Sequence, residues 1–136
     1  MIKVLRAICI AILLFVAPAH AEEPADSIQS VIEDQLSAFQ QNDAATAFQF
    51  ASPSIQSKFG NAETFARMVQ QGYPMVWRPR SHRMGELLQT EVGPVQVVVF
   101  EDTSGRLYEA GYLMQEVDGV WRINGVKLRA LPALGA

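Results

Sequence analysis

The second half of the chain consists of four short β-like runs, and this feature constrains the fold most. Residues after Arg80 show no helical period, and turn signals separate the runs at Gly93-Pro94, 102–105 and Asp118-Gly119. Asp118-Gly119 is typical of a two-residue hairpin turn in which both residues take a positive φ. Runs joined by such short turns predict an antiparallel meander of four strands. The predicted strands are 83–90, 94–101, 106–116 and 120–128.

The first half shows the spacing of amphipathic helices. Apolar side chains recur every three or four residues from 26 to 42, and Asp26 with Gln29 resembles a capping box at the start of this segment. We therefore expect a helix over 26–42 with Asp26 as its N-cap. Its apolar face consists of Ile28, Val31, Ile32, Leu36 and Phe39.

Two more helices and one helical turn are expected before the strands. A short alanine-rich helix ends before Ser52-Pro53, and that pair begins a single turn that Gly60 ends. A third helix is predicted over 61–71, with Gly72 as a left-handed C-terminal residue. Residues 75–81 contain proline and are predicted to form an extended connector. Three helices followed by one sheet indicate an α+β fold with the helices on one face of the sheet.

The order of helices, connector and sheet resembles the nuclear-transport-factor-2-like cone fold, which polyketide cyclases, ketosteroid isomerases and scytalone dehydratase share. The hairpin from Asp118 to Val126 (DGVWRINGV) resembles the final hairpin common in that superfamily. The segment from Phe65 to Arg80 (FARMVQQGYPMVWRPR) is similar to a small proteobacterial family of secreted proteins of unknown function. The resemblance implies three N-terminal helices packed on a curved four-stranded antiparallel sheet. It implies no catalytic residue, because this fold hosts both enzymes and non-catalytic binders.

Residues 1–21 have the composition of a secretory signal peptide. Lys3 and Arg6 precede an apolar run over 7–17, and Ala19-His20-Ala21 fits a cleavage site. The run is about half of the ~20 residues that a membrane-spanning helix needs. We therefore expect cleavage after Ala21, a periplasmic or secreted protein, and no stable membrane anchor after processing. The rest is expected to be one domain over 22–130 with a C-terminal tail over 131–136.

Composition excludes several classes of function once that segment is removed. Without Lys3 and Arg6 the basic side chains fall from 11 to nine against 14 acidic ones, for a net charge of −5. This charge disfavours binding of nucleic acid, whose phosphates attract Lys and Arg. The single cysteine, Cys9, leaves with the segment, so thiol chemistry and a thiolate metal site are not expected. The sequence also contains no cofactor-binding loop or metal-ligand cluster, and we expect no cofactor and no metal.

Five aromatic side chains could line one cavity of such a cone. They come from the connector and the last two predicted strands, where Tyr108 and Tyr112 share a face by the period of two. Their rings suit a flat apolar ligand that hydroxyl groups orient. The alternative is that the rings simply fill the core. The five candidates are Tyr73, Trp77, Tyr108, Tyr112 and Trp121.

Three arginines and a histidine lie close together at the start of the sheet. Arg78, Arg80, His82 and Arg83 concentrate positive charge in an acidic protein, and guanidinium groups pair well with carboxylate or phosphate. They could bind an anion, or they could lie in solvent beside acidic side chains. His82 is the only histidine of residues 22–136, so it is the first candidate for general-base chemistry near neutral pH.

Three functional hypotheses follow. The first is a non-catalytic periplasmic protein that binds a small apolar or anionic ligand, or a partner protein, through the aromatic and basic candidates. The second is an isomerase, cyclase or dehydratase in which Tyr108 or Tyr112 polarises a carbonyl and His82 moves a proton. The third is a structural homodimer, because the strand over 94–100 is apolar on both faces and needs a cover on each. A polar group of shifted pKa beside a tyrosine hydroxyl would favour the enzyme.

Overall fold

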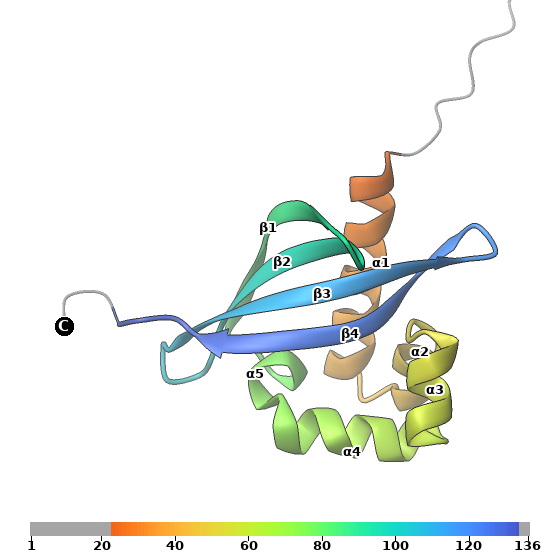
Figure 1. Cartoon of the computed structure of the whole chain (residues 1–136). Helices are drawn as coiled ribbons and strands as arrows, with labels where there is room; N and C mark the ends of the chain where they lie inside the picture. Colours follow the sequence, from red (N-terminus) through yellow and green to blue (C-terminus); the bar gives the residue numbers. More distant parts are fainter. Residues whose placement is uncertain (1–22, 134–136) are drawn as a thin grey trace, which may run out of the picture.

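The computed structural model describes residues 23–133, in which five helices precede a four-stranded sheet (Figure 1). The predicted signal peptide over 1–21, its cleavage point and the end of the predicted tail, 134–136, lie outside the described residues. The helices are α1 (Pro24–Gln40), α2 (Ala44–Gln49), α3 (Pro53–Phe59), α4 (Ala62–Gly72) and α5 (Pro74–Trp77). The strands are β1 (Ser81–Thr90), β2 (Gly93–Glu101), β3 (Leu107–Val117) and β4 (Val120–Ala130). Over 23–133, none of the helices has the length and apolar character needed to cross a membrane.

Helix α1 begins earlier than the sequence predicts. Glu23 is its N-cap in an extended conformation, and Pro24 occupies the first turn. Proline is favourable there because the backbone N–H that it lacks would have no partner within the helix. Asp26 lies inside the first turn, where its charge is favourable at the positive end of the helix dipole. The prediction of Asp26 as the N-cap is therefore wrong. The apolar face is as expected, with Ile28, Ile32, Leu36 and Phe39 buried.

The short helices differ most from the expectation. The Ser52 side chain accepts a hydrogen bond from the Ile55 N–H, and α3 continues from there to Phe59 as a full helix instead of a single turn. Helix α5 forms where an extended connector was predicted, because proline is tolerated in the first turn and Pro74 begins the helix. Gly72 is the last residue of α4 and lacks a positive φ, so it is not a left-handed cap.

The sheet is the predicted antiparallel meander, with the strand order β1-β2-β3-β4. Asp118 and Gly119 have φ values of 51° and 78° and form the predicted turn between β3 and β4. The ladder continues into the predicted tail, because the Leu131 N–H donates to the Leu107 carbonyl at 2.9 Å. The strands are thus slightly longer than the sequence pattern indicates.

The five helices of the described residues lie against one face of the sheet, and the core lies between the two layers (Figure 1). Alternate residues of β2 and β3 point into this core, including the buried Val98, Phe100 and Tyr112. On the opposite face, Val95 and Val97 of β2 are half-buried, and no element of residues 23–133 covers them. The α+β architecture with helices on one face is therefore confirmed.

A buried glutamine fills an irregularity between β1 and β2. The register of the two strands shifts around Gly85 and Glu86. The Gln96 side-chain amide lies 2.9 Å from the Gly85 carbonyl, 3.3 Å from that of Glu86 and 2.9 Å from that of Val97. Gln96 is fully buried. Its amide therefore supplies donors to carbonyl groups at a bulge, where the regular ladder is interrupted.

Replacement of Gln96 by leucine should lower the free energy of unfolding by about 2 kcal/mol, because buried carbonyl groups lose their donor. Urea denaturation followed by circular dichroism measures this change. Gln89 is exposed on β1 and offers the control, since Gln89→Leu should change the free energy by less than about 0.5 kcal/mol. A Gln96→Leu protein as stable as the wild type would contradict the role given to this amide.

Candidate functional site

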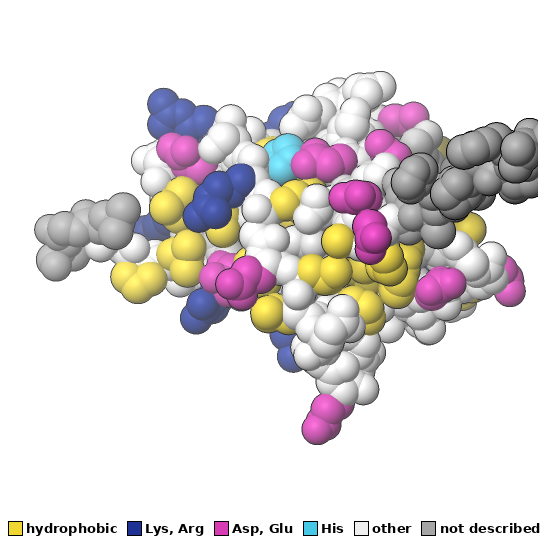
Figure 2. Space-filling model, turned by 90° about the horizontal axis from the view of Figure 1, so that it is seen from above, with side chains coloured by type: hydrophobic (Ala, Val, Ile, Leu, Met, Phe, Trp, Pro, Cys, Tyr) yellow, Lys and Arg dark blue, Asp and Glu magenta, His cyan; other side chains and the backbone are white. Residues whose placement is uncertain are grey.

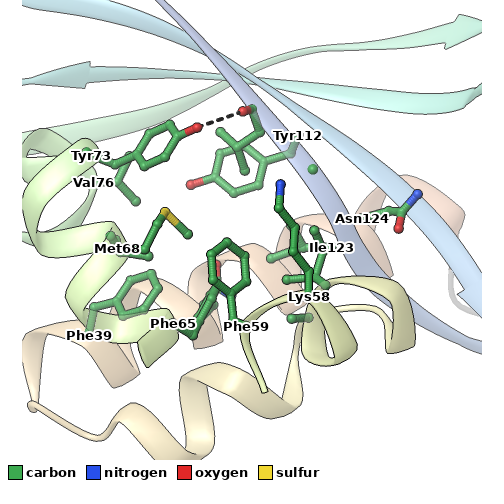
Figure 3. Close-up of a pocket in the computed structure, with 17 residues that line it drawn as sticks. Phe39, Lys58, Phe59, Phe65, Met68, Tyr73, Val76, Tyr112, Ile123 and Asn124 are labelled. Atoms are coloured by element: carbon green, nitrogen blue, oxygen red, sulfur yellow. Dashed lines mark hydrogen bonds between the residues drawn. The ribbon is translucent and has the colours of Figure 1, made fainter. Parts of the chain in front are cut away.

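A cavity of about 540 Å³ lies between the sheet and the helices (Figure 3). This volume falls within the roughly 300–1,000 Å³ of small-molecule sites. Helices α1, α3, α4 and α5 supply one side of its wall, and β3 and β4 supply the other. The wall is mostly aromatic and aliphatic, with Phe39, Phe59, Phe65, Met68 and Ile123 among its residues.

Phe65 lies at the centre of an aromatic cluster that forms part of this wall. Its ring centroid is 6.1 Å from that of Phe39, 5.5 Å from that of Phe48 and 5.8 Å from that of Phe59. The three partner rings come from α1, α2 and α3, whereas Phe65 belongs to α4. Aromatic pairs stabilise a core beyond the area that they bury. The cluster therefore holds four helices together on the helical side of the cavity.

A bulge in β4 brings Asn124 into the cavity wall. The register of β3 and β4 shifts beside Met114 and leaves Asn124 without a pairing partner. The Ser52 hydroxyl donates to Asn124 Oδ1 at 2.7 Å. The backbones also meet here, because the Ser52 N–H donates to the Ile123 carbonyl and the Ile123 N–H donates to the Phe50 carbonyl, each at 2.8 Å. The bulge thus fixes the beginning of α3 against the sheet.

Tyr112 is the most unusual polar residue of the cavity. It is fully buried, and its hydroxyl is the one buried side-chain oxygen or nitrogen among residues 23–133 that has no hydrogen-bond partner within the protein. Burial raises the pKa of Tyr112 well above its usual value, and the nearby charge of Glu33 raises it further. The hydroxyl therefore stays protonated at neutral pH and can donate a hydrogen bond. In Figure 3 it points into the cavity.

Among the other polar side chains of the wall, Tyr73 and Gln35 form hydrogen bonds within the protein, whereas Lys58 is exposed. Tyr73 Oη donates to the Val126 carbonyl at 3.4 Å, the contact drawn in Figure 3. Gln35 Nε2 donates to a backbone carbonyl of α2 at 3.2 Å. Lys58 of α3 is exposed, and its amine lies 5.6 Å from the ring centroid of Phe59. Within the described part of the chain, Lys58 is the only charged residue that lines the cavity.

Two of the five aromatic candidates line this cavity. Tyr73 and Tyr112 belong to its wall, whereas Trp77, Tyr108 and Trp121 do not. The Trp77 ring packs against a phenylalanine of α1, with the centroids 5.2 Å apart. Tyr108 lies on the same face of β3 as Tyr112, nearer the start of the strand. Trp121 lines a separate groove between α1 and the β3–β4 turn. The five rings therefore do not converge on one site.

Arg78 contacts the end of α1. Its guanidinium group donates to the Phe39 carbonyl at 2.6 Å and to Asn42 Oδ1 at 2.6 Å, and it lies over the Trp77 ring at 5.0 Å from the centroid. Helix α1 has no basic residue in its own last turn. Arg78 therefore supplies the positive charge that stabilises the C-terminal end of a helix. Its guanidinium N–H groups are hydrogen-bonded to other parts of the protein.

The other members of the basic cluster have separate partners. Arg80 pairs with Glu101 at 3.4 Å, and Arg83 is exposed on β1. His82 Nε2 lies 2.9 Å from Glu33 Oε2, a contact between β1 and α1. Figure 2 shows this histidine side chain beside acidic ones at the surface. The cluster therefore does not form one anion site.

His82 and the cavity tyrosine are not brought together. His82 is not among the lining residues. The Phe100 ring contacts both side chains, with its centroid 6.0 Å from that of His82 and 6.5 Å from that of Tyr112. The Phe100 ring thus lies between His82 and Tyr112, one of the two tyrosines that were expected to act with this histidine.

Sequence reasoning missed most of the helical side of the site and the bulge of β4. Lys58, Phe59 and Met68 of the helices and Asn124 of β4 line the cavity, and none was a candidate. One signal was present, because a helix that begins at Ser52-Pro53 places Phe59 on its apolar face with a lysine beside it. The signal has little specificity, since such a lysine is typical of any exposed helical position.

The comparisons with known proteins agree with this architecture. The family described as Domain of unknown function (DUF4864) matches residues 21–135. The chain belongs to this family. Because the match spans all of the described residues, the helices, the sheet and the cavity between them are parts of the DUF4864 domain of this chain.

A solved structure shares the fold of this DUF4864 protein. It is an NTF-2 like protein of unknown function from Shewanella oneidensis MR-1, with 13% sequence identity and a TM-score of 0.55. The similarity covers 78% of this chain and 98% of that chain. At such low identity the likeness concerns the fold alone, and it confirms the nuclear-transport-factor-2-like cone. No curated protein matches the chain.

Proposed function

We propose that this DUF4864 protein binds a small, mostly apolar molecule in its cavity and orients it by a hydrogen bond from Tyr112. The observation that carries the proposal is the fully buried Tyr112 hydroxyl without a hydrogen-bond partner. Such groups are rare in native proteins, and each costs about 1–3 kcal/mol. An acceptor oxygen on a bound molecule would pair with this donor, and the aromatic wall would cover the rest of the molecule.

Binding without catalysis is the better-supported role. General acid–base catalysis needs a group of suitable pKa within reach of the reacting atoms. No His, Asp or Glu of residues 23–133 lines the cavity, and the raised pKa of Tyr112 favours a donor over a base. An isomerase, cyclase or dehydratase that uses His82 has less support, because His82 contacts Glu33 outside the cavity.

Access to the Tyr112 hydroxyl requires a small movement of the wall. Its oxygen is buried, so an incoming oxygen must displace a neighbouring side chain. Met68 is half-buried and lines the same cavity (Figure 3). An unbranched thioether side chain adapts readily to a new neighbour. We assign this movement to Met68.

The proposed place of action is the periplasm or the cell exterior. Its support is the signal-peptide character of residues 1–21, namely Lys3 and Arg6, the apolar run after them and the small residues before Glu22. Mature protein in that compartment would begin at Glu22 and meet small molecules that cross the cell envelope.

A structural homodimer is a second candidate role, supported by the outer face of β2. Val95 and Val97 are half-buried there. A Cβ at Gly85 would lie 3.1 Å from the Val97 side chain, and one at Gly111 would lie 3.2 Å from that of Val95. The valine side chains therefore lie over the two glycines and form an apolar strip. We propose a second copy of the same strip as its cover, since identical patches pair in two-fold dimers.

Tyr112→Phe should weaken binding without lowering stability. Loss of one hydrogen bond should reduce the affinity for 2-naphthol, a flat apolar molecule with one oxygen, about 2- to 10-fold. Removal of an unpaired buried hydroxyl should leave the free energy of unfolding unchanged or raise it by up to about 1 kcal/mol. Isothermal titration calorimetry and urea denaturation measure the two effects.

Two controls isolate the hydroxyl. Naphthalene has no oxygen, so it should bind wild-type protein and Tyr112→Phe with equal affinity. Tyr108→Phe removes a hydroxyl from the same face of β3 outside the cavity and should leave 2-naphthol binding unchanged. Equal affinity of 2-naphthol for the wild type and Tyr112→Phe would count against the proposed function.

A further inference from the structure

We infer that the ligand carries a negative charge at the outer end of the cavity, where it pairs with Lys58. The inference rests on the proposed function, because it concerns the same cavity. Lys58 and Tyr112 lie at different depths, since Lys58 is exposed and Tyr112 is fully buried. Figure 3 shows the lysine side chain extending from α3 along the cavity that Tyr112 borders. The cavity therefore has a cationic group at its mouth and a neutral donor at its inner wall.

The charged side chain in the cavity wall is positive, and Glu33, whose charge acts on Tyr112, does not line the cavity. Lys58 is the only charged lining residue of the described chain, and the ion pairs found over 23–133 do not include it. Its amine instead lies 5.6 Å from the ring centroid of Phe59, which is itself part of the wall. A single positive charge beside an apolar cavity attracts an anion and orients it on entry.

The two polar groups together define a class of ligand. Tyr112 can donate one hydrogen bond to an oxygen at the inner end, and Lys58 can donate to a carboxylate at the outer end. The same wall includes the rings of Phe59, Phe65 and Tyr73, which suit a flat ring system. The class is an aromatic or alicyclic monocarboxylate with a hydroxyl or carbonyl oxygen opposite the carboxylate.

A matched pair of probes tests the charge. 6-Hydroxy-2-naphthoate and 6-hydroxy-2-naphthamide share their ring system and hydroxyl, but only the first is negatively charged at neutral pH. Wild-type protein should bind the carboxylate about three- to fivefold more tightly than the amide in calorimetry at low salt. High salt should reduce this preference, because ions screen an exposed pair.

Lys58→Met keeps an apolar stem and removes the charge, so it should bind both probes with equal affinity. The variant should fold normally because Lys58 is exposed. Lys127→Met is the matched control, since Lys127 is an exposed lysine of β4 that does not line the cavity, and it should keep the wild-type preference. Tyr112→Phe should lower the affinity for both probes by the same factor.

The outcomes separate the inference from the proposed function. If both probes depend on Tyr112 but the wild type shows no preference for the carboxylate, the inference is overturned and the proposed function stands. The same conclusion follows if Lys58→Met retains the wild-type preference. If neither probe depends on Tyr112, the inference and the proposed function both fail.

Discussion

Val98→Asp should prevent the protein from folding at room temperature. Val98 is fully buried and packs in the core between the sheet and the helices. Burial of an unpaired carboxylate costs several kcal/mol, which is comparable with the whole stability of about 5–15 kcal/mol of an ordinary domain. Loss of the far-UV circular dichroism signal of the native protein would report the effect. A folded Val98→Asp protein would contradict the inward direction of this side chain.

Val97→Asp is both the matched control and the test of the homodimer. Val97 is the preceding residue of β2 and points to the outer face, where it is half-buried. In a monomer the new carboxylate would meet water, so the variant should fold. If the outer face pairs with a second copy, the wild type should sediment as a dimer and Val97→Asp as a folded monomer. A wild type that sediments as a monomer at micromolar concentration would exclude the homodimer.

Phe65→Ala should lower the free energy of unfolding by about 3–5 kcal/mol, because the surroundings of a deleted buried ring relax only in part. Phe65 is 6% exposed and contacts three other rings from three helices. The loss should therefore weaken the whole helical side of the cavity. Urea denaturation followed by tryptophan fluorescence measures it, since Trp77 packs against Phe39 in the same region.

Phe65→Leu is the control for this change. Leucine keeps part of the volume and all of the apolar character, so the cost should fall to about 1–2 kcal/mol. An equal loss for leucine and alanine would indicate that ring contacts, and not filled volume, stabilise the cluster. A loss below about 1 kcal/mol for Phe65→Ala would contradict the central place given to this residue.

Local signals explain which parts of the fold the sequence could predict. The turn at Asp118-Gly119 requires two positive φ values, and few residue pairs other than Asn-Gly or Asp-Gly adopt them readily. The strand pattern and the apolar face of α1 also depend on neighbouring residues only. Helix α5 was missed because Pro79 in the segment 75–81 was taken to favour an extended connector, whereas Pro74 just before it begins a helix.

The candidate site depends on contacts between distant segments. Tyr108 and Tyr112 point to the same face of β3, because side chains alternate between the two faces of a strand. Only the positions of α3 and α4 decide which of the two lines the cavity. Arg78 belonged to a predicted anion site, but its donors are used by the end of α1, 39 residues away in the chain. Lys58 lines the cavity because α3 packs beside it, a placement that depends on tertiary contacts. No local pattern contains this information.

The bulge around Gly85 has a consequence for aggregation. β1 is an edge strand of the sheet, and an open edge offers unpaired backbone groups to any other extended chain. β4, at the other edge, is partly covered where Ile123 bridges to Ala51. In β1 the bulge interrupts the regular backbone, and Arg83 and Glu86 add exposed charges. Edge-to-edge growth is thereby discouraged at β1, and the proposed homodimer would use the valine face of β2 instead of this edge.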